Sequence, residues 1–199
     1  MARVVYPAGT AIGVHALANE QIFTVLKGRA EFQVGREKKT VGAGEAVLIR
    51  PRTDFAASIL EDFEVLRFRD RGPGASAGKT GGQGPSFFKW AEMNSDFITP
   101  KYSSGTGPTV SGERIEVAWM NYPAGTEAKP HSHPNEQIQV PLKGKILGLG
   151  GPDVVSGPNE VILIPINTLH GVRILEDYET VNCKNIVPGF SVYHARWEK

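Results

Sequence analysis

Residues 122–144 read YPAGTEAKPHSHPNEQIQVPLKG, and residues 6–28 read YPAGTAIGVHALANEQIFTVLKG. The two stretches align without a gap and share 13 of 23 positions. A second pair, residues 45–64 and 160–179, shares 9 of 20 positions. Self-similarity at a fixed spacing indicates that one structural unit occurs twice. The chain of 199 residues therefore predicts two small domains with a common strand plan.

Short apolar runs separated by Gly, Pro and Asn predict strands through most of the chain. In the first copy these runs cover 20–26, 30–34, 46–49 and 63–68, and their partners cover 136–142, 145–149, 161–164 and 178–181. Residues 114–121 predict a strand that opens the second copy. Residues 87–94 have modest helical character and predict a short helix packed on the second copy. We therefore expect an all-β fold.

Composition excludes several classes of partner. The net charge is +1, so nothing favours nucleic-acid binding or a membrane surface, and no apolar run approaches the length of a membrane span. The N-terminal residues contain no apolar stretch of signal-peptide length, which predicts a cytoplasmic protein. The single cysteine, Cys183, rules out an internal disulfide and is predicted to be a buried apolar residue. The sequence leaves both a monomer and a homodimer open.

Residues 71–86 contain six glycines and no large apolar residue, and therefore predict a flexible linker between the two copies. The expected boundaries are 1–70 for the first domain and 87–199 for the second. Gly-Lys-Thr at 78–80 suggests a phosphate-binding loop, but the first glycine of that motif would fall at Pro73. We therefore reject the phosphate-loop interpretation.

The second copy carries the side chains suited to bind a metal. Residues two apart on a strand share one face, so His131 and His133 can converge on one ion. The same parity directs Gln137 towards that face and Glu136 away from it. His170 follows a turn and could reach the same ion from an adjacent strand. These three imidazoles and one amide oxygen are the predicted metal ligands, although Glu136 or water remains an alternative to Gln137.

The first copy lacks most of this set. His15 corresponds to His131, but Leu17 stands where the second copy has His133, and Phe55 stands where it has His170. Apolar groups at these positions predict a filled core. We interpret the first copy as a packing partner without a metal site, with an apolar ligand pocket as the alternative.

These motifs resemble those of the cupin superfamily. The matching residues of its first motif are Gly125, His131, His133, Gln137 and Gly144, and those of its second motif are Gly157, Pro165, Asn167 and His170. Asn167 replaces a glycine, but Asn tolerates the left-handed backbone conformation that such turns require. The resemblance implies two tandem double-stranded β-helix (jelly-roll) barrels, a bicupin, with a degenerate metal site in 1–70 and an intact one in 87–199.

The resemblance also implies a reaction class. Cupins usually have a glutamate ligand at the position of Gln137. A glutamine at this position resembles the motif of a subset that includes uronate-processing proteins and cupin hydroxynitrile lyases. The expected cofactor is one divalent transition metal ion, and the sequence does not distinguish Fe, Mn, Ni and Zn. Without a carboxylate ligand, this ion keeps its charge of +2 and favours Lewis-acid chemistry. We therefore expect an isomerase or lyase acting on a small oxygenated substrate that carries a carbonyl, hydroxy or carboxylate group.

Two alternatives remain open: an Fe-dependent dioxygenase, and a non-catalytic module that binds a metal or a sugar. The catalytic acid or base is not identified by the sequence. The polar residues considered as acid, base or substrate clamp are Lys129, Arg114, Arg173, Tyr122 and Tyr193.

Overall fold

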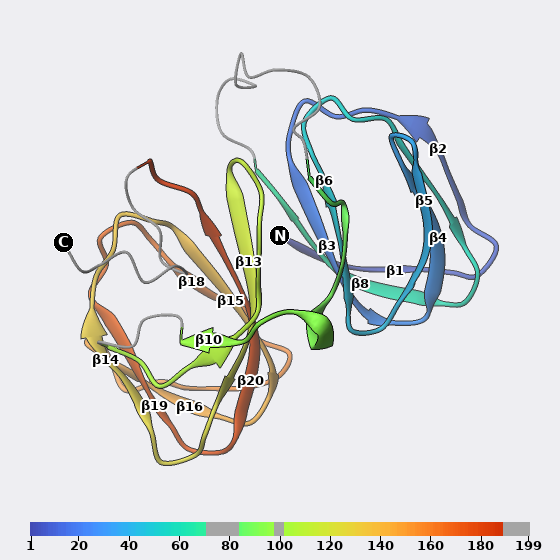
Figure 1. The fold of residues 1–199 in the computed structure, drawn as a ribbon. Helices are drawn as coiled ribbons and strands as arrows, with labels where there is room; N and C mark the ends of the chain where they lie inside the picture. The colour runs from blue at the N-terminus through green and yellow to red at the C-terminus, as the bar shows by residue number, and fades with distance from the viewer. Residues whose placement is uncertain (71–83, 98–101, 189–199) are drawn as a thin grey trace. The chain divides into compact units, whose positions relative to one another are not determined.

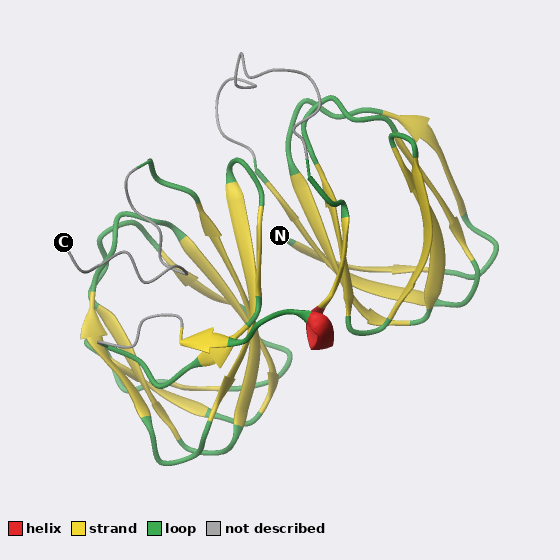
Figure 2. Ribbon diagram, in the orientation of Figure 1, coloured by secondary structure: helices red, strands yellow, loops and turns green. Residues whose placement is uncertain are grey.

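The computed structural model describes residues 1–70, 84–97 and 102–188. The chain divides into two compact units. Unit 1 comprises Met1–Met93 and Gly112–Ile115, and unit 2 comprises Asn94–Ser111 and Glu116–Lys199. The described residues form strands almost throughout, with one short 3-10 helix, Trp90–Glu92 (Figures 1 and 2). The expectation of an all-β fold is confirmed.

Unit 1 contains two antiparallel sheets. The five-stranded sheet has the order β1 (Ala2–Tyr6), β8 (Phe63–Arg69), β3 (Gln21–Lys27), β6 (Glu45–Ile49) and β9 (Phe87–Lys89). The four-stranded sheet has the order β2 (Ala11–His15), β7 (Phe55–Ile59), β4 (Arg29–Val34) and β5 (Glu37–Gly42). Apart from β4 and β5, neighbouring strands in these sheets are not consecutive in sequence, as in a jelly roll.

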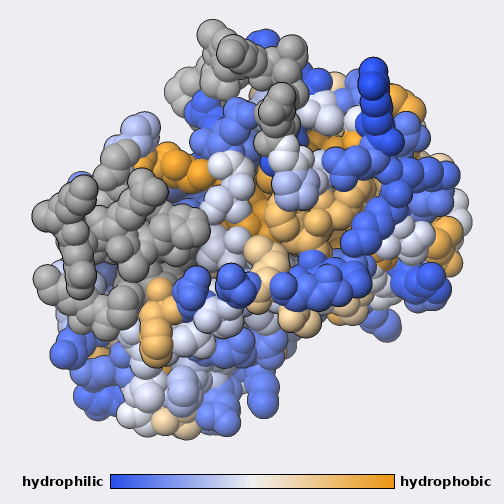
Figure 3. Space-filling model, viewed as in Figure 1, coloured by the Kyte–Doolittle hydropathy of each residue, from blue (hydrophilic) through white to orange (hydrophobic). Residues whose placement is uncertain are grey.

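The core of unit 1 consists of apolar side chains from both sheets, because alternate residues of each strand point to the same face. Phe32 packs between Phe23 and Phe63, with ring centroids 5.6 and 6.1 Å away. Burial of these side chains is the main stabilising contribution to the unit. In the space-filling view, hydrophobic residues also appear on the visible face of unit 1, with hydrophilic residues around them (Figure 3).

Unit 2 also contains two sheets. The larger sheet has the order β10 (Asp96–Phe97), β11 (Thr106–Gly107), β13 (Ile115–Tyr122), β20 (Tyr178–Asn185), β15 (Gln137–Lys143) and β18 (Ile162–Ile164), with β12 (Thr109–Ser111) also paired to β13. The smaller sheet has the order β14 (Glu127–His131), β19 (His170–Ile174), β16 (Ile146–Leu149) and β17 (Val155–Ser156). Every strand predicted from the repeat is present.

The two units share an irregularity of strand pairing as well as their strand order. In unit 1 the register between β2 and β7 shifts between Ile12 and His15. In unit 2 the register between β14 and β19 shifts at the equivalent place, between Ala128 and His131. Such bulges redirect the side chains that follow them. The repeat therefore preserves the local backbone that presents the first histidine.

Residues 87–94 do not form the helix that was expected to pack on the second copy. Phe87–Lys89 forms strand β9 on the edge of β6, and only Trp90–Glu92 is helical. The prediction was wrong because hydrogen bonding along the open edge of β6 outweighs a weak local helix preference. The contacts of this segment also place it in unit 1, so the second unit begins after the expected residue 87. Of the predicted linker, residues 71–83, including the Gly-Lys-Thr sequence, lie outside the described residues.

Glu20 connects a loop to the sheet of unit 1. Its side chain is fully buried, and its carboxylate accepts hydrogen bonds from the backbone N–H groups of Glu113, Arg114 and Ile115 at 2.7, 3.0 and 3.0 Å. Charged acceptors make stronger hydrogen bonds than neutral ones. Glu20 therefore has a structural role, whereas its repeat counterpart Glu136 is exposed.

Within 1–70, 84–97 and 102–188, no helix has the length and apolar character needed to cross a membrane.

Candidate metal centre

Three histidines of unit 2 converge at one point. His131 ends β14, His170 begins β19 as its register partner, and His133 lies in the loop that follows β14. The ring centroids of His170 lie 4.5 Å from those of His131 and 4.7 Å from those of His133. One nitrogen from each ring lies within 4.8 Å of the others. The structure therefore brings together three of the four side chains predicted to bind a metal, in a cluster that could hold one ion.

The backbone sets the orientation of all three rings. In each histidine, Nδ1 lies within hydrogen-bonding distance of a backbone carbonyl two residues away along the chain. These pairs are His131 with Lys129 (2.7 Å), His133 with Asn135 (2.9 Å) and His170 with Thr168 (2.8 Å). Because Nδ1 donates its proton to a carbonyl, the lone pair of each ring is on Nε2, which is the usual arrangement of metal-binding imidazoles.

Gln137 is the fourth predicted ligand. Its Oε1 lies 3.2 Å from Nε2 of His133, and its Nε2 points to Oε1 of Gln139 at 3.5 Å. Gln139 in turn donates to the Tyr178 hydroxyl at 2.8 Å, which fixes the orientation of its own amide. Two lone-pair atoms therefore face each other at His133 and Gln137, an arrangement that a cation between them would stabilise. Glu136 is exposed.

Burial affects the protonation of the cluster. It lowers the pKa of both His133 and His170 to about 4, and it lowers the pKa of His131. Lys184 contributes to each shift through charge repulsion. All three imidazoles are therefore neutral near pH 7, which is the form that coordinates a metal.

A turn connects two of the histidines. Asn167 adopts a left-handed conformation with φ of 58°, and its backbone N–H donates to the carbonyl of His133 at 2.9 Å. In unit 1, Arg52 has φ of 60° and its N–H donates to Leu17 at 2.6 Å. The expectation that Asn167 would adopt the conformation of the missing glycine is confirmed, and the turn holds His133 close to the start of β19.

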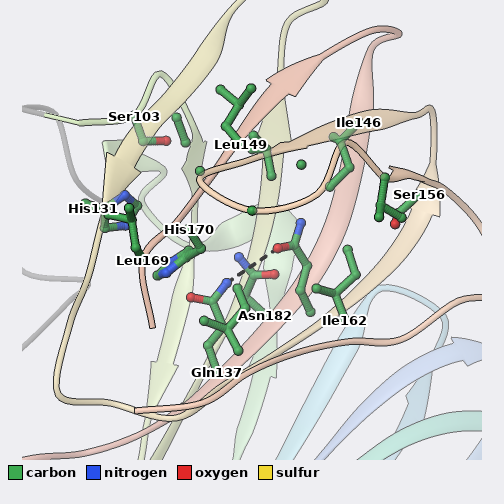
Figure 4. A pocket seen from close by; sticks show the side chains of 18 of the residues that line it. Ser103, His131, Gln137, Ile146, Leu149, Ser156, Ile162, Leu169, His170 and Asn182 are labelled. Carbon is green, nitrogen blue, oxygen red and sulfur yellow. Dashed lines mark hydrogen bonds between the residues drawn. The ribbon is translucent and has the colours of Figure 1, made fainter. Parts of the chain in front are cut away.

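Of the three histidines, His131 and His170 line a cavity of about 260 Å³ within unit 2. Its polar lining side chains include Ser103, Gln137, Gln139, Ser156, Asn182 and Lys184. Its apolar lining side chains include Ile146, Leu149, Val154, Ile162, Ile164 and Val172. Figure 4 shows His131 and His170 on one side of this cavity and Ile146 and Ile162 on the other.

The sequence alone did not point to Lys184. Only 5% of its surface is exposed, and it lines the cavity as the register partner of Gln137. Burial lowers its pKa to about 7, against the opposing effect of Glu116. The predicted strand stopped at residue 181, whereas β20 continues to Asn185. With the full strand, alternation from the buried Tyr178 would have assigned Lys184 to the interior.

Among the five polar residues considered from the sequence, Tyr122 lines the cavity. Burial raises the pKa of its hydroxyl, so the hydroxyl stays protonated near pH 7. Lys129 and Arg173 are exposed, and Arg114 belongs to unit 1. Tyr193 lies outside the described residues. Tyr122 is therefore the one of these five that the described structure brings to the cavity.

The equivalent positions of unit 1 have no comparable cluster in the described residues. His15 packs against Phe55 with ring centroids 4.2 Å apart, much as His131 packs against His170. Leu17 packs against the hydrophobic core of unit 1. The space used by imidazoles in unit 2 is thus occupied by apolar side chains, as the sequence predicted.

Comparison with known proteins identifies the fold. Residues 2–66 match the family Cupin_2, described as a cupin domain. None of the curated proteins compared with this sequence matches it. Many solved structures are similar to this chain in fold.

AerE from Microcystis aeruginosa is 15% identical, with a TM-score of 0.73, over 92% of this chain and 85% of that chain. A cupin 2 conserved barrel domain protein from Leptotrichia buccalis is 15% identical, with a TM-score of 0.65, over 92% and 81% of the two chains. Oxalate decarboxylase from Bacillus subtilis, a protein with Mn(II) centres, is 14% identical, with a TM-score of 0.65, over 96% and 68%. Identities this low indicate a shared fold alone. The chain therefore has a cupin-like jelly-roll fold, and its residues 2–66 match the model of the cupin domain family.

Proposed function

We propose that this protein is a metal-dependent enzyme that acts on a small oxygenated substrate by isomerase or lyase chemistry. One divalent transition metal ion is held by His131, His133, His170 and Gln137. The observation that carries the proposal is the convergence of three imidazoles, with one nitrogen from each ring within 4.8 Å of the others, beside a cavity of about 260 Å³.

The donor set fits such an ion. Imidazole nitrogens suit Fe, Mn, Ni and Zn, and each ring here has a backbone carbonyl that fixes its orientation. The amide of Gln137 offers a neutral oxygen at 3.2 Å from His133. Four neutral ligands would leave coordination positions and the full charge of the ion available to a substrate.

The bound ion would supply Lewis-acid polarisation of a carbonyl, hydroxyl or carboxylate oxygen. The protein supplies the surroundings of that oxygen. The Tyr122 hydroxyl is buried and protonated, so it is suited to donate a hydrogen bond rather than to remove a proton. The apolar wall formed in part by Ile146 and Ile162 excludes water from the substrate.

The proposal includes two tandem cupin barrels, of which the first is a packing partner. The shared register break at His15 and His131 supports this organisation, as does the matching turn at Arg52 and Asn167. Residues Leu17 and Phe55 would keep the first barrel free of metal.

The first experiment is elemental analysis of untagged wild-type protein and of His133→Leu, which copies the residue of unit 1. We expect about one equivalent of metal in the wild type and almost none in the variant. A second measurement follows solvent deuterium into small 2-oxo and 2-hydroxy acids by NMR. Metal-dependent exchange that disappears in His133→Leu would support proton-transfer chemistry.

Other outcomes distinguish the alternatives. Oxygen uptake by the Fe(II)-loaded protein in place of deuterium exchange would favour a dioxygenase. Stoichiometric metal with neither reaction would favour a non-catalytic binding module. Failure of the wild type to take up metal after reconstitution would contradict the proposed function.

A further inference from the structure

With a divalent ion bound, the metal-binding end of the cavity would carry an excess of positive charge. The four proposed ligands are neutral, and none of the described residues that line the cavity is an aspartate or glutamate. Lys184 lines the same end and is the register partner of Gln137 across β15 and β20. A bound ion and Lys184 would therefore share one enclosed space.

The negative charge of Glu116 does not cancel the positive charge expected at this end of the cavity. Glu116 is buried, with 3% of its surface exposed, and its carboxylate interacts electrostatically with Lys184. It can offset one positive charge, which still leaves the charge of the ion. Buried charges are costly unless they are paired. A ligand that brings negative charge to this end of the cavity would be favoured over a neutral ligand of the same shape.

The other end of the cavity has a different character. Ile146 and Ile162 form part of its wall, and Figure 4 shows them across the cavity from the histidines. No charged side chain occurs among the described residues of that wall. A volume of about 260 Å³ lies just below the usual range for ligand pockets, which begins at about 300 Å³. The ligand is therefore small, and one of its ends is apolar.

We propose that the cavity binds a small carboxylate whose oxygen atoms lie between the histidine cluster and Lys184, and whose apolar group packs against Ile146 and Ile162. This inference rests on the proposed function, since it assigns a substrate class to the same metal site. Lys184 holds the carboxylate by charge and hydrogen bonding, and the isoleucines select for the apolar group.

The test is titration calorimetry on protein reconstituted with Zn(II), with metal content measured on the same sample. The probes are acetate, butanoate, hexanoate and neutral hexanamide. We expect hexanoate to bind at least tenfold more tightly than hexanamide. Affinity should rise by about fourfold for each added methylene until the cavity is filled. This comparison uses only the wild type, so it does not depend on any variant folding.

Variants then assign the charge to one side chain. Lys184→Met keeps the length of the side chain and removes its charge, and we expect hexanoate to bind at least tenfold more weakly while about one equivalent of Zn(II) is retained. Lys143→Met is the matched control, because Lys143 is exposed and its replacement should leave both measurements unchanged. Ile162→Ser should reduce the dependence on chain length and leave acetate binding unaffected.

The outcomes separate the two proposals. Normal metal content with equal binding of hexanoate and hexanamide, or with hexanoate binding unchanged in Lys184→Met, would overturn the carboxylate assignment and leave the metal site standing. A wild type without metal would contradict the proposed function. If that metal-free protein still bound hexanoate and Lys184→Met did not, the anion site would be supported without the metal. If the metal-free protein did not bind hexanoate, this inference would be overturned too.

Discussion

His131 and His170 are register partners on β14 and β19, and their rings lie 4.5 Å apart. His15 and Phe55 are the register partners at the same place in unit 1, with rings 4.2 Å apart. The backbone arrangement is thus common to both units. The side chains placed on it decide whether the position can bind a metal.

Exchanging these side chains for their counterparts should remove the metal from unit 2. His170→Phe and His133→Leu each delete one imidazole and introduce a residue that unit 1 already accommodates. We expect metal content to fall from about one equivalent to less than a tenth in either variant, as measured by elemental analysis. His15→Ala is the control and should retain full metal content. Equal losses in His15→Ala and His170→Phe would contradict a site confined to unit 2.

Gln137→Glu should strengthen metal binding. A carboxylate adds a negative charge beside the ion, and we expect the dissociation constant for a divalent metal to fall by roughly tenfold, or about 1.4 kcal/mol. Competition with a colorimetric chelator measures this constant. Glu136→Gln alters the exposed neighbour and should have little effect. If Gln137→Glu left the affinity unchanged, Gln137 would not be a ligand.

The metal-free protein should lose stability in mild acid. His133 and His170 have pKa values of about 4 in the folded state, below the ordinary value of 6.5. The unfolded chain therefore binds more protons between these limits, so stability falls as pH drops from 6.5 towards 4 and is unaffected above that window. Thermal melts at pH 7.5 and 5 should show this loss.

The double variant His133→Leu/His170→Phe provides the comparison for these melts. Because it lacks both imidazoles, its midpoint should fall over the same pH interval by at least about 5 °C less than that of the wild type. Working above pH 5 limits the contribution of surface carboxylates, which titrate near 4. Identical pH dependence in the double variant and the wild type would show that other groups cause the acid sensitivity.

Glu20→Gln should destabilise unit 1. Glu20 accepts three backbone hydrogen bonds, and an amide replaces one of its oxygens with a donor that cannot accept them. We expect a loss of about 2–3 kcal/mol in the free energy of unfolding, measured with urea. Glu136→Gln is the matched control, because Glu136 is exposed and its loss should cost under about 0.5 kcal/mol. Equal effects would contradict the structural role of Glu20.

Much of the fold could be predicted from the repeat, since 13 identities over one segment align strands, turns and the first histidine together. The sequence assigned His131 and Gln137 to the site and Glu136 away from it, but strand alternation is not the reason, because β14 ends at His131 and β15 begins at Gln137. The turn at Asn167 followed from the tolerance of asparagine for positive φ. These successes depend on patterns that are local in sequence.

The remaining features depend on contacts between distant segments. Phe87–Lys89 forms a strand because β6 offers an open edge, which local propensity does not encode. Lys184 lies beside the histidines because β20 pairs with β15, and the apolar wall at Ile146 comes from the other sheet. The loop held by Glu20 is more than 90 residues away in sequence. Strand periodicity alone cannot assemble such neighbours.

The register break common to both units gives unit 1 the means to acquire a site of its own. His15 is already presented there, and Gln21 is buried at the place that Gln137 has in unit 2. Replacing Leu17 and Phe55 with histidine would supply the two missing imidazoles on a backbone that needs no remodelling. A chain that then carried two metal ions would show that gain and loss of a metal centre in this fold can be a matter of two side chains.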